Sequence, residues 1–156
     1  MNISVELGSL LADAEQAGAY FVDARDRESL VEAGRLLRYT VAPVDLRNCA
    51  DLDAVMREIA DALQFPEWFG GNLDALADCM NDLSWLPSGG YVVVLEHIGD
   101  WRERAPDEVD DVIDILNDAA ARWADDQVPF WSFLPLSPRE LEAMGDNTGE
   151  DASPGA

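Results

Sequence analysis

The chain has 156 residues, 48% of them hydrophobic, and 32 acidic against 10 basic residues give it a formal net charge of −22. This length suits one domain with one core, and the charge argues against nucleic acid and anionic membranes as partners. The sequence has no run of 18 apolar residues and no basic segment before an apolar stretch, so we expect neither a membrane span nor a secretory signal.

The acidity has two interpretations. It keeps a protein soluble, and it also attracts a basic partner and accelerates association at low salt. The same charge leads us to expect a monomer that forms a 1:1 complex. The two cysteines, Cys49 and Cys79, are too few for a disulfide framework, so we expect both to be reduced and packed in the core of a cytoplasmic protein.

The first 38 residues predict an N-terminal extension of the domain, made of helices and a strand. Residues 7–18 place leucines at helical spacing before Gly18, which is a suitable stop. Residues 19–22 are a short apolar run that predicts a strand, and residues 26–37 predict a second helix. We expect this extension to add to the sheet of the domain.

Strands and helices alternate over residues 39–144, which we assign to the main domain. Residues 39–46 predict a strand, in which Pro43 indicates an edge or a bulge because proline donates no hydrogen bond to a ladder. Asp51 caps a helix that ends before Pro66. One apolar stripe runs along this helix: Leu52, Val55, Met56, Ile59, Ala60 and Leu63.

The second half of this domain continues the alternation. We expect a helix over residues 72–83, a strand buried on both faces over 91–95, a long helix from about 107 to 123 and a strand over 130–134. Ser137 and Glu140 have capping-box spacing and predict a short last helix. Residues 145–156 predict a disordered acidic tail. The fold class is therefore α/β, a small parallel sheet of three to four strands with helices packed on it in three layers.

Residues 65–83 form the segment that carries chemistry. Trp68 and Phe69 precede the pair Gly70 and Gly71, which lets the backbone turn tightly and approach a partner. On the helix that follows, one face carries the aspartates at positions 74, 78 and 82. Like charges at this spacing repel by about 0.2–0.5 kcal/mol per pair, and no Lys or Arg lies between Arg57 and Arg102 to relieve them. An acidic stripe beside exposed aromatics is typical of a binding surface, although solvated acidic faces are also common.

The stretch Phe-Pro-Glu-Trp-Phe-Gly-Gly-Asn-Leu-Asp-Ala-Leu-Ala-Asp-Cys, residues 65–79, resembles the hallmark of the barstar family. The order of elements from about residue 39 to residue 134 also resembles that family. The resemblance implies an intracellular protein inhibitor of a basic, barnase-type ribonuclease with an immunity role. Such an inhibitor is not an enzyme, and it needs no cofactor and no metal.

The resemblance also implies where the partner binds. Asp78 would take the place of the substrate phosphate, Asp74 would be its acidic companion, and Trp68 would stack at the rim of the nuclease active site. The family often has Trp at the position of Ala77, so this contact must be smaller or differently filled here. The residues we expect at the interface are Trp68, Phe69, Gly70, Gly71, Asn72, Leu73, Asp74, Asp78, Asn81, Asp82 and Asp118.

Two other functions fit parts of the sequence. A binding module for a different basic protein or toxin would use the same acidic helix without blocking a nuclease. An enzyme could use His97, which follows a predicted parallel strand, with Glu96, Asp100 or Cys79 as its partner. No nucleophile elbow, phosphate loop or metal-ligand spacing supports that second alternative.

Overall fold

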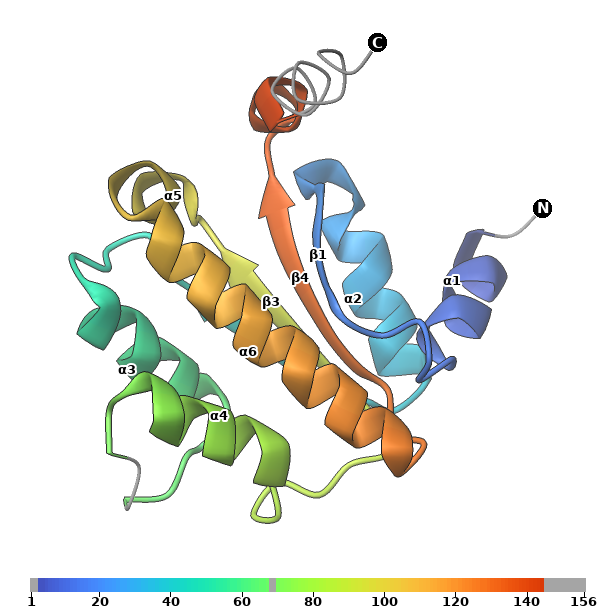
Figure 1. The fold of residues 1–156 in the computed structure, drawn as a ribbon. Helices are drawn as coiled ribbons and strands as arrows, with labels where there is room; N and C mark the ends of the chain where they lie inside the picture. Colours follow the sequence, from blue (N-terminus) through green and yellow to red (C-terminus); the bar gives the residue numbers. More distant parts are fainter. Residues whose placement is uncertain (1–2, 68–69, 145–156) are drawn as a thin grey trace, which may run out of the picture.

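The computed structural model describes residues 3–67 and 70–144, and the side chains from residue 6 onward. These residues form one four-stranded parallel sheet with the order β1-β4-β3-β2 (Figure 1). The strands are β1 (Ala19–Asp23), β2 (Thr40–Asp45), β3 (Tyr91–Glu96) and β4 (Phe130–Leu136). The small parallel α/β sheet expected from the alternation is therefore confirmed.

Helices cover both faces of this sheet and produce three layers. One layer holds α1 (Ile3–Leu11) and α2 (Arg27–Leu36), the latter preceded by the 3-10 turn η1 (Ala24–Asp26). The other layer holds α3 (Leu52–Ala62), α4 (Leu73–Asp82), α5 (Gly99–Arg104) and α6 (Pro106–Asp125). Figure 1 shows α6 running along the sheet with α3 and α4 beside it, and α1 and α2 on the opposite face. Residues 138–144 are also helical.

Alternate residues of the central strand β3 serve the two cores. Val92 and Val94 pack with α1 and α2, whereas Tyr91, Val93 and Leu95 pack with α3 to α6. All five of these side chains are at most 1% exposed. The continuous apolar run of this strand is thus explained, because neighbouring strands pair on both sides and helices cover both faces.

Local capping agrees with the sequence at two helix starts. The Asp51 carboxylate accepts a hydrogen bond from the Ala54 backbone N–H at 2.9 Å. At residue 137 the predicted capping box is present, since the Ser137 N–H donates to Glu140 Oε1 at 2.8 Å and the Glu140 N–H donates to Ser137 Oγ at 3.1 Å. Each bond satisfies a backbone donor that the helix itself leaves free.

One helical assignment was wrong, and one helix was not predicted. The first helix spans residues 3–11, not 7–18, because the chain turns after Leu11 and the Asp13 carboxylate accepts from the Glu15 N–H at 3.0 Å. Helix α5 was not predicted, since six residues are too few to show a helical period. It follows His97, whose φ of 61° makes the chain turn sharply after β3.

Other expectations about individual residues hold. Pro43 lies on β2, which is an edge strand, and its ring is exposed. Cys49 and Cys79 are free and buried. No helix within residues 3–67 and 70–144 is both long and apolar enough to cross a membrane. The tail predicted over residues 145–156 lies outside the described residues.

Candidate functional site

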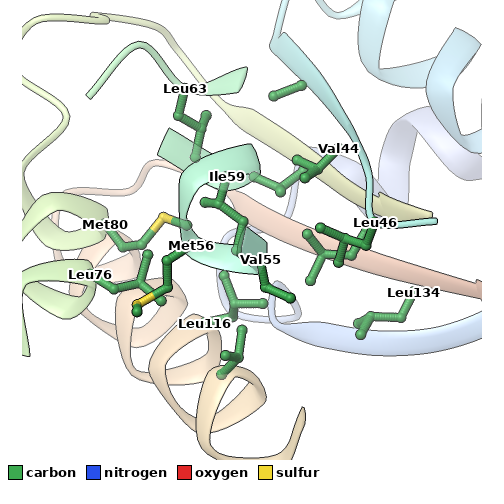
Figure 2. Packing of buried hydrophobic residues seen from close by; sticks show 14 of the residues in the cluster. Val44, Leu46, Val55, Met56, Ile59, Leu63, Leu76, Met80, Leu116 and Leu134 are labelled. Atoms are coloured by element: carbon green, nitrogen blue, oxygen red, sulfur yellow. The ribbon is translucent and has the colours of Figure 1, made fainter. Parts of the chain in front are cut away.

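Helix α4 is anchored at its start and along its inner face. The Asn72 side chain accepts a hydrogen bond from the Ala75 N–H at 2.7 Å, and Gly71 just before it has a φ of 72°, which favours glycine. Leu76 and Met80 are fully buried. Figure 2 shows them beside Met56, in the core that α4 shares with α3 and α6. The outer face of α4 is therefore held in one orientation by the packing beneath it.

The end of α4 is fixed by two tryptophans. The indole N–H of Trp123, on α6, donates to the Met80 carbonyl at 2.8 Å. The indole N–H of Trp85 donates to the Leu63 carbonyl at 3.0 Å, and its ring meets Phe65 edge to face at 5.9 Å between centroids. Trp85 is half-buried in this position and ties the segment that follows α4 to the end of α3. Sequence reasoning did not find either indole hydrogen bond, because each joins residues that are far apart in the sequence.

The three aspartates of α4 are exposed on its outer face. Asp82 accepts only a 3.3 Å hydrogen bond from the Ser84 hydroxyl. Within residues 3–67 and 70–144, the side chains of Asp74 and Asp78 have neither a hydrogen bond nor an ion pair. The expected stripe of uncompensated carboxylates is thus present on a rigid helix.

The remaining expected contact residues lie around this stripe in different environments. Gly70, Gly71 and Asn72 are exposed at the start of α4, whereas Leu73 turns partly into the core. Asn81 is half-buried, and its Oδ1 atom has no hydrogen-bond partner in the part of the chain that is described. Asp118 is exposed on α6, the helix that packs along α4. Trp68 and Phe69 lie outside the described residues.

Ala77 is the position at which the sequence departs from the hallmark quoted above. It is half-buried on α4, next to Asp78. A methyl group there leaves the neighbouring carboxylate less flanked by apolar surface than an indole would.

His97 does not form the catalytic pair that the enzyme alternative requires. Its Nδ1 atom lies 2.9 Å from Asp45 Oδ1 and its Nε2 atom 2.9 Å from Arg47 Nη2, so its partners are not the residues expected from the sequence. The Arg47 backbone N–H and the His97 ring hold the pKa of the Asp45 carboxyl below its usual value. Glu96 instead pairs with Arg27 at 3.0 Å.

Cys79 is equally unsuited to act as a nucleophile. It faces the core with no exposed surface, and burial, with Asp78 and Asp82 nearby, raises the pKa of its thiol to about 11. A thiol with this pKa stays protonated at neutral pH and reacts slowly. Among the described residues, no three His, Cys, Asp or Glu side chains converge as a metal site.

Comparison with known proteins gives two matches. The family model described as Barstar (barnase inhibitor) matches residues 39–135, which is more than half of the chain. The Bacillus subtilis (strain 168) protein named "Putative ribonuclease inhibitor YrdF" is 28% identical over 83 residues, covering 53% of this chain and 88% of that protein. The family match runs from just before β2 into β4 and leaves α1, β1 and α2 outside.

Proposed function

The chain belongs to the barstar family, and from this premise we propose that it inhibits a basic ribonuclease by placing α4 and the loop before it in the nuclease active site. The family description names barnase inhibition, and the curated relative carries the name of a ribonuclease inhibitor. On this proposal the protein is not an enzyme. Its role is to bind and block.

The observation that carries the proposal is the set of unpaired carboxylates on the anchored helix α4. A ribonuclease active site is a cationic pocket that holds phosphate, and a carboxylate that enters it forms charge-assisted hydrogen bonds. Asp78 takes the phosphate position and Asp74 supports it one turn earlier. Because both side chains lack internal partners, neither has to break an ion pair before it binds.

The contacts around these two carboxylates complete the proposed interface. Asn72 and the glycines before it lie against the enzyme, with Trp68 and Phe69 at the rim of its active site. Asn81 and Asp82 extend the contact along α4, and Asp118 adds charge from α6. One chain binds one nuclease molecule, and the net charge of −22 steers a cationic enzyme toward it.

We place this activity in the cytoplasm, as self-protection against a nuclease of the secreted type. The two buried thiols fit a reducing compartment. A second candidate is a barstar-like binding module for a different basic protein or toxin. The small side chain of Ala77 favours this candidate, because a nuclease surface shaped to contact an indole at that position would not be filled by a methyl group.

The decisive experiment is an affinity capture from lysate and culture medium of the native host, with three baits. The baits are the wild type, Asp78→Ala, and Glu32→Ala, a control that removes an exposed carboxylate from α2 on the opposite layer. The proposal predicts that the wild type and the control retain a small basic ribonuclease and silence its activity on RNA, whereas Asp78→Ala does neither.

The other outcomes are equally informative. A partner that depends on Asp78 but has no nuclease activity would replace the inhibitor proposal with the second candidate. A partner retained equally by all three baits would remove α4 from the binding site.

A further inference from the structure

The ten arginines of this chain are unevenly distributed over the fold. The four parallel strands end at one edge of the sheet, and an arginine follows each of these ends within six residues. Figure 1 shows this edge at the tips of β3 and β4, beside α5 and the helical residues 138–144. Six arginines follow the strand ends: Arg25 and Arg27 after β1, Arg47 after β2, Arg102 and Arg104 after β3, and Arg139 after β4. A chain with a net charge of −22 thus places more than half of its positive side chains after the carboxyl ends of its strands.

Most of these arginines already have polar partners. The partners are Asp23 for Arg25, Glu96 and Glu28 for Arg27, His97 for Arg47 and the Cys49 carbonyl for Arg104. The side chains of Arg102 and Arg139 differ, because neither has a hydrogen bond or an ion pair within residues 3–67 and 70–144. The Arg102 guanidinium lies over the Phe21 ring, with Cζ 5.3 Å from the centroid, and this contact provides no oxygen acceptor for its N–H groups.

The two arginines without polar partners line the same cavity, which has a volume of about 670 Å³. It lies between α5, the start of α6 and residues 138–144. Glu103 and Glu140 also line it, and Pro106 and Met144 supply apolar surface. Small-molecule sites in proteins have volumes of roughly 300–1,000 Å³ and combine apolar surface with a few polar groups. The size and the lining of this cavity are those of such a site.

A smaller cavity of about 250 Å³ adjoins the first one, since Gly99 and Glu140 line both. It lies at the carboxyl ends of β1, β3 and β4, and its lining includes Ala24, Glu96 and Pro135. The connection after β1 leads to α2 on one face of the sheet, and the connection after β3 leads to α5 and α6 on the other face. Where connections leave toward opposite faces, an open α/β sheet forms the crevice in which ligands bind.

We propose that these adjoining cavities bind a small organic phosphate ester that carries hydroxyl groups, of the class of a nucleoside monophosphate. The guanidinium groups of Arg102 and Arg139 donate charge-assisted hydrogen bonds to the phosphate oxygens. The carboxylates of Glu103 and Glu140 accept from the hydroxyl groups. The base packs against the apolar surface at Met144.

The carboxylates in the lining disfavour a bare anion. Glu140 uses its Oε1 atom to accept from the Ser137 N–H at 2.8 Å, and its Oε2 atom has no partner among the described residues. This Oε2 atom lies 3.0 Å from the point that a Cβ atom on Gly99 would occupy, next to the backbone that lines both cavities. Inorganic phosphate would be repelled by Glu103 and Glu140, whereas an ester places its hydroxyl donors away from its charge. The lining therefore favours an ester over the free anion.

The proposed ligand site is separate from the proposed inhibitor site. Of the described residues that line the two cavities, none belongs to α3 or α4. The ligand proposal does not rest on the inhibitor function, and either one can fail without the other.

The first measurement is titration calorimetry with adenosine 5′-monophosphate on the wild type, Arg139→Gln and Arg35→Gln. Both arginines are exposed and make no side-chain hydrogen bond or ion pair among the described residues, so neither change should unfold the chain. Only Arg139 lines the cavity, and Arg35 on α2 is the matched control. We expect a Kd below about 1 mM for the wild type and the control, and a Kd at least about tenfold higher for Arg139→Gln.

The second measurement identifies the ligand chemistry and locates the site. Titrations with ribose 5-phosphate and with inorganic phosphate should show weaker binding than the nucleotide, with inorganic phosphate the weakest. In amide NMR spectra of the wild type, the nucleotide should shift the resonances of Gly99 and Arg102 and leave that of Asp78 on α4 in place.

Four results would overturn the proposal. They are no nucleotide binding up to about 10 mM, equal affinities in Arg139→Gln and Arg35→Gln, inorganic phosphate that binds as tightly as the nucleotide, and amide shifts confined to residues outside the two cavities.

Discussion

The two helical layers of this protein bury apolar residues against the same sheet, yet they leave opposite kinds of surface exposed. The layer of α3 to α6 exposes carboxylates over a core that includes Leu76 and Met80. The layer of α1 and α2 leaves Leu10 and Leu36 exposed, and Leu10 lines a groove with Tyr20 of β1. The family match covers the first layer and none of the second. The two layers therefore present a charged surface and an apolar surface on the two sides of one sheet.

The layers also differ in how their helices are held. Helix α4 has a side-chain cap at Asn72 and a bond from Trp123 to its backbone, whereas Asp26 at the start of α2 makes no capping hydrogen bond. A binding helix that is fixed before it meets its partner loses less entropy on association. The difference thus fits a recognition role for α4 and a packing role for α2.

The largest expected effect is on the affinity for the partner, which should depend on a carboxylate of α4 and not on one of α2. Asp78→Ala should lower the affinity for the captured partner at least 30-fold, equivalent to about 2 kcal/mol, because it removes a carboxylate at the centre of the proposed interface. Glu32→Ala should change affinity less than twofold. Titration calorimetry measures both, and thermal unfolding should show Asp78→Ala unchanged or slightly stabilised, because it relieves repulsion along α4. Equal losses of affinity in the two variants would contradict the assignment of the binding site to α4.

Salt should act mainly through the acidic layer. Raising ionic strength from 0.05 to 0.5 M should slow association with a basic partner by roughly tenfold, because screening removes the attraction of this layer. Stopped-flow binding at a series of salt concentrations measures the rate. An association rate that does not change with salt would contradict the prediction.

The capping difference predicts unequal stability losses. Asn72→Ala should lower the free energy of unfolding by about 1 kcal/mol, because the Ala75 N–H loses its acceptor. Asp26→Ala should cost less than about 0.5 kcal/mol, since no hydrogen bond is lost at that helix start. Urea denaturation measures both. A larger loss in Asp26→Ala would show that α2 is capped in solution.

The smallest effect concerns the buried thiol under α4. Burial raises the pKa of Cys79 to about 11, from an ordinary value near 9. Below pH 9 both the folded and the unfolded thiol are protonated, and between pH 9 and 11 only the unfolded thiol ionises, so stability should fall over that interval. Cys79→Val should show a shallower decline in stability across the same pH range. An identical decline in the variant would assign the effect to other groups.

The sequence predicted most of the fold because its signals are local. The apolar stripe from Leu52 to Leu63, the buried run from Tyr91 to Leu95 and the Ser137–Glu140 capping box each specify an element through residues that are close in the chain. Short or turn-rich stretches were predicted poorly. Helix α5 has too few residues to show a period, and the turn at Asp13 depends on one side-chain bond that competes with the helix.

For the candidate site, the sequence alone determined which residues share a face, since Asp74, Asp78 and Asp82 follow the helical repeat, and motif resemblance indicated the family. Only the tertiary structure decided what surrounds that face. It brought Trp123 to the Met80 carbonyl, gave His97 its partners Asp45 and Arg47, and placed β1 at an edge of the sheet, where Asn117 of α6 accepts from the Ala19 N–H. These contacts join residues tens of positions apart, and such contacts depend on the packing of whole layers, which no local pattern encodes.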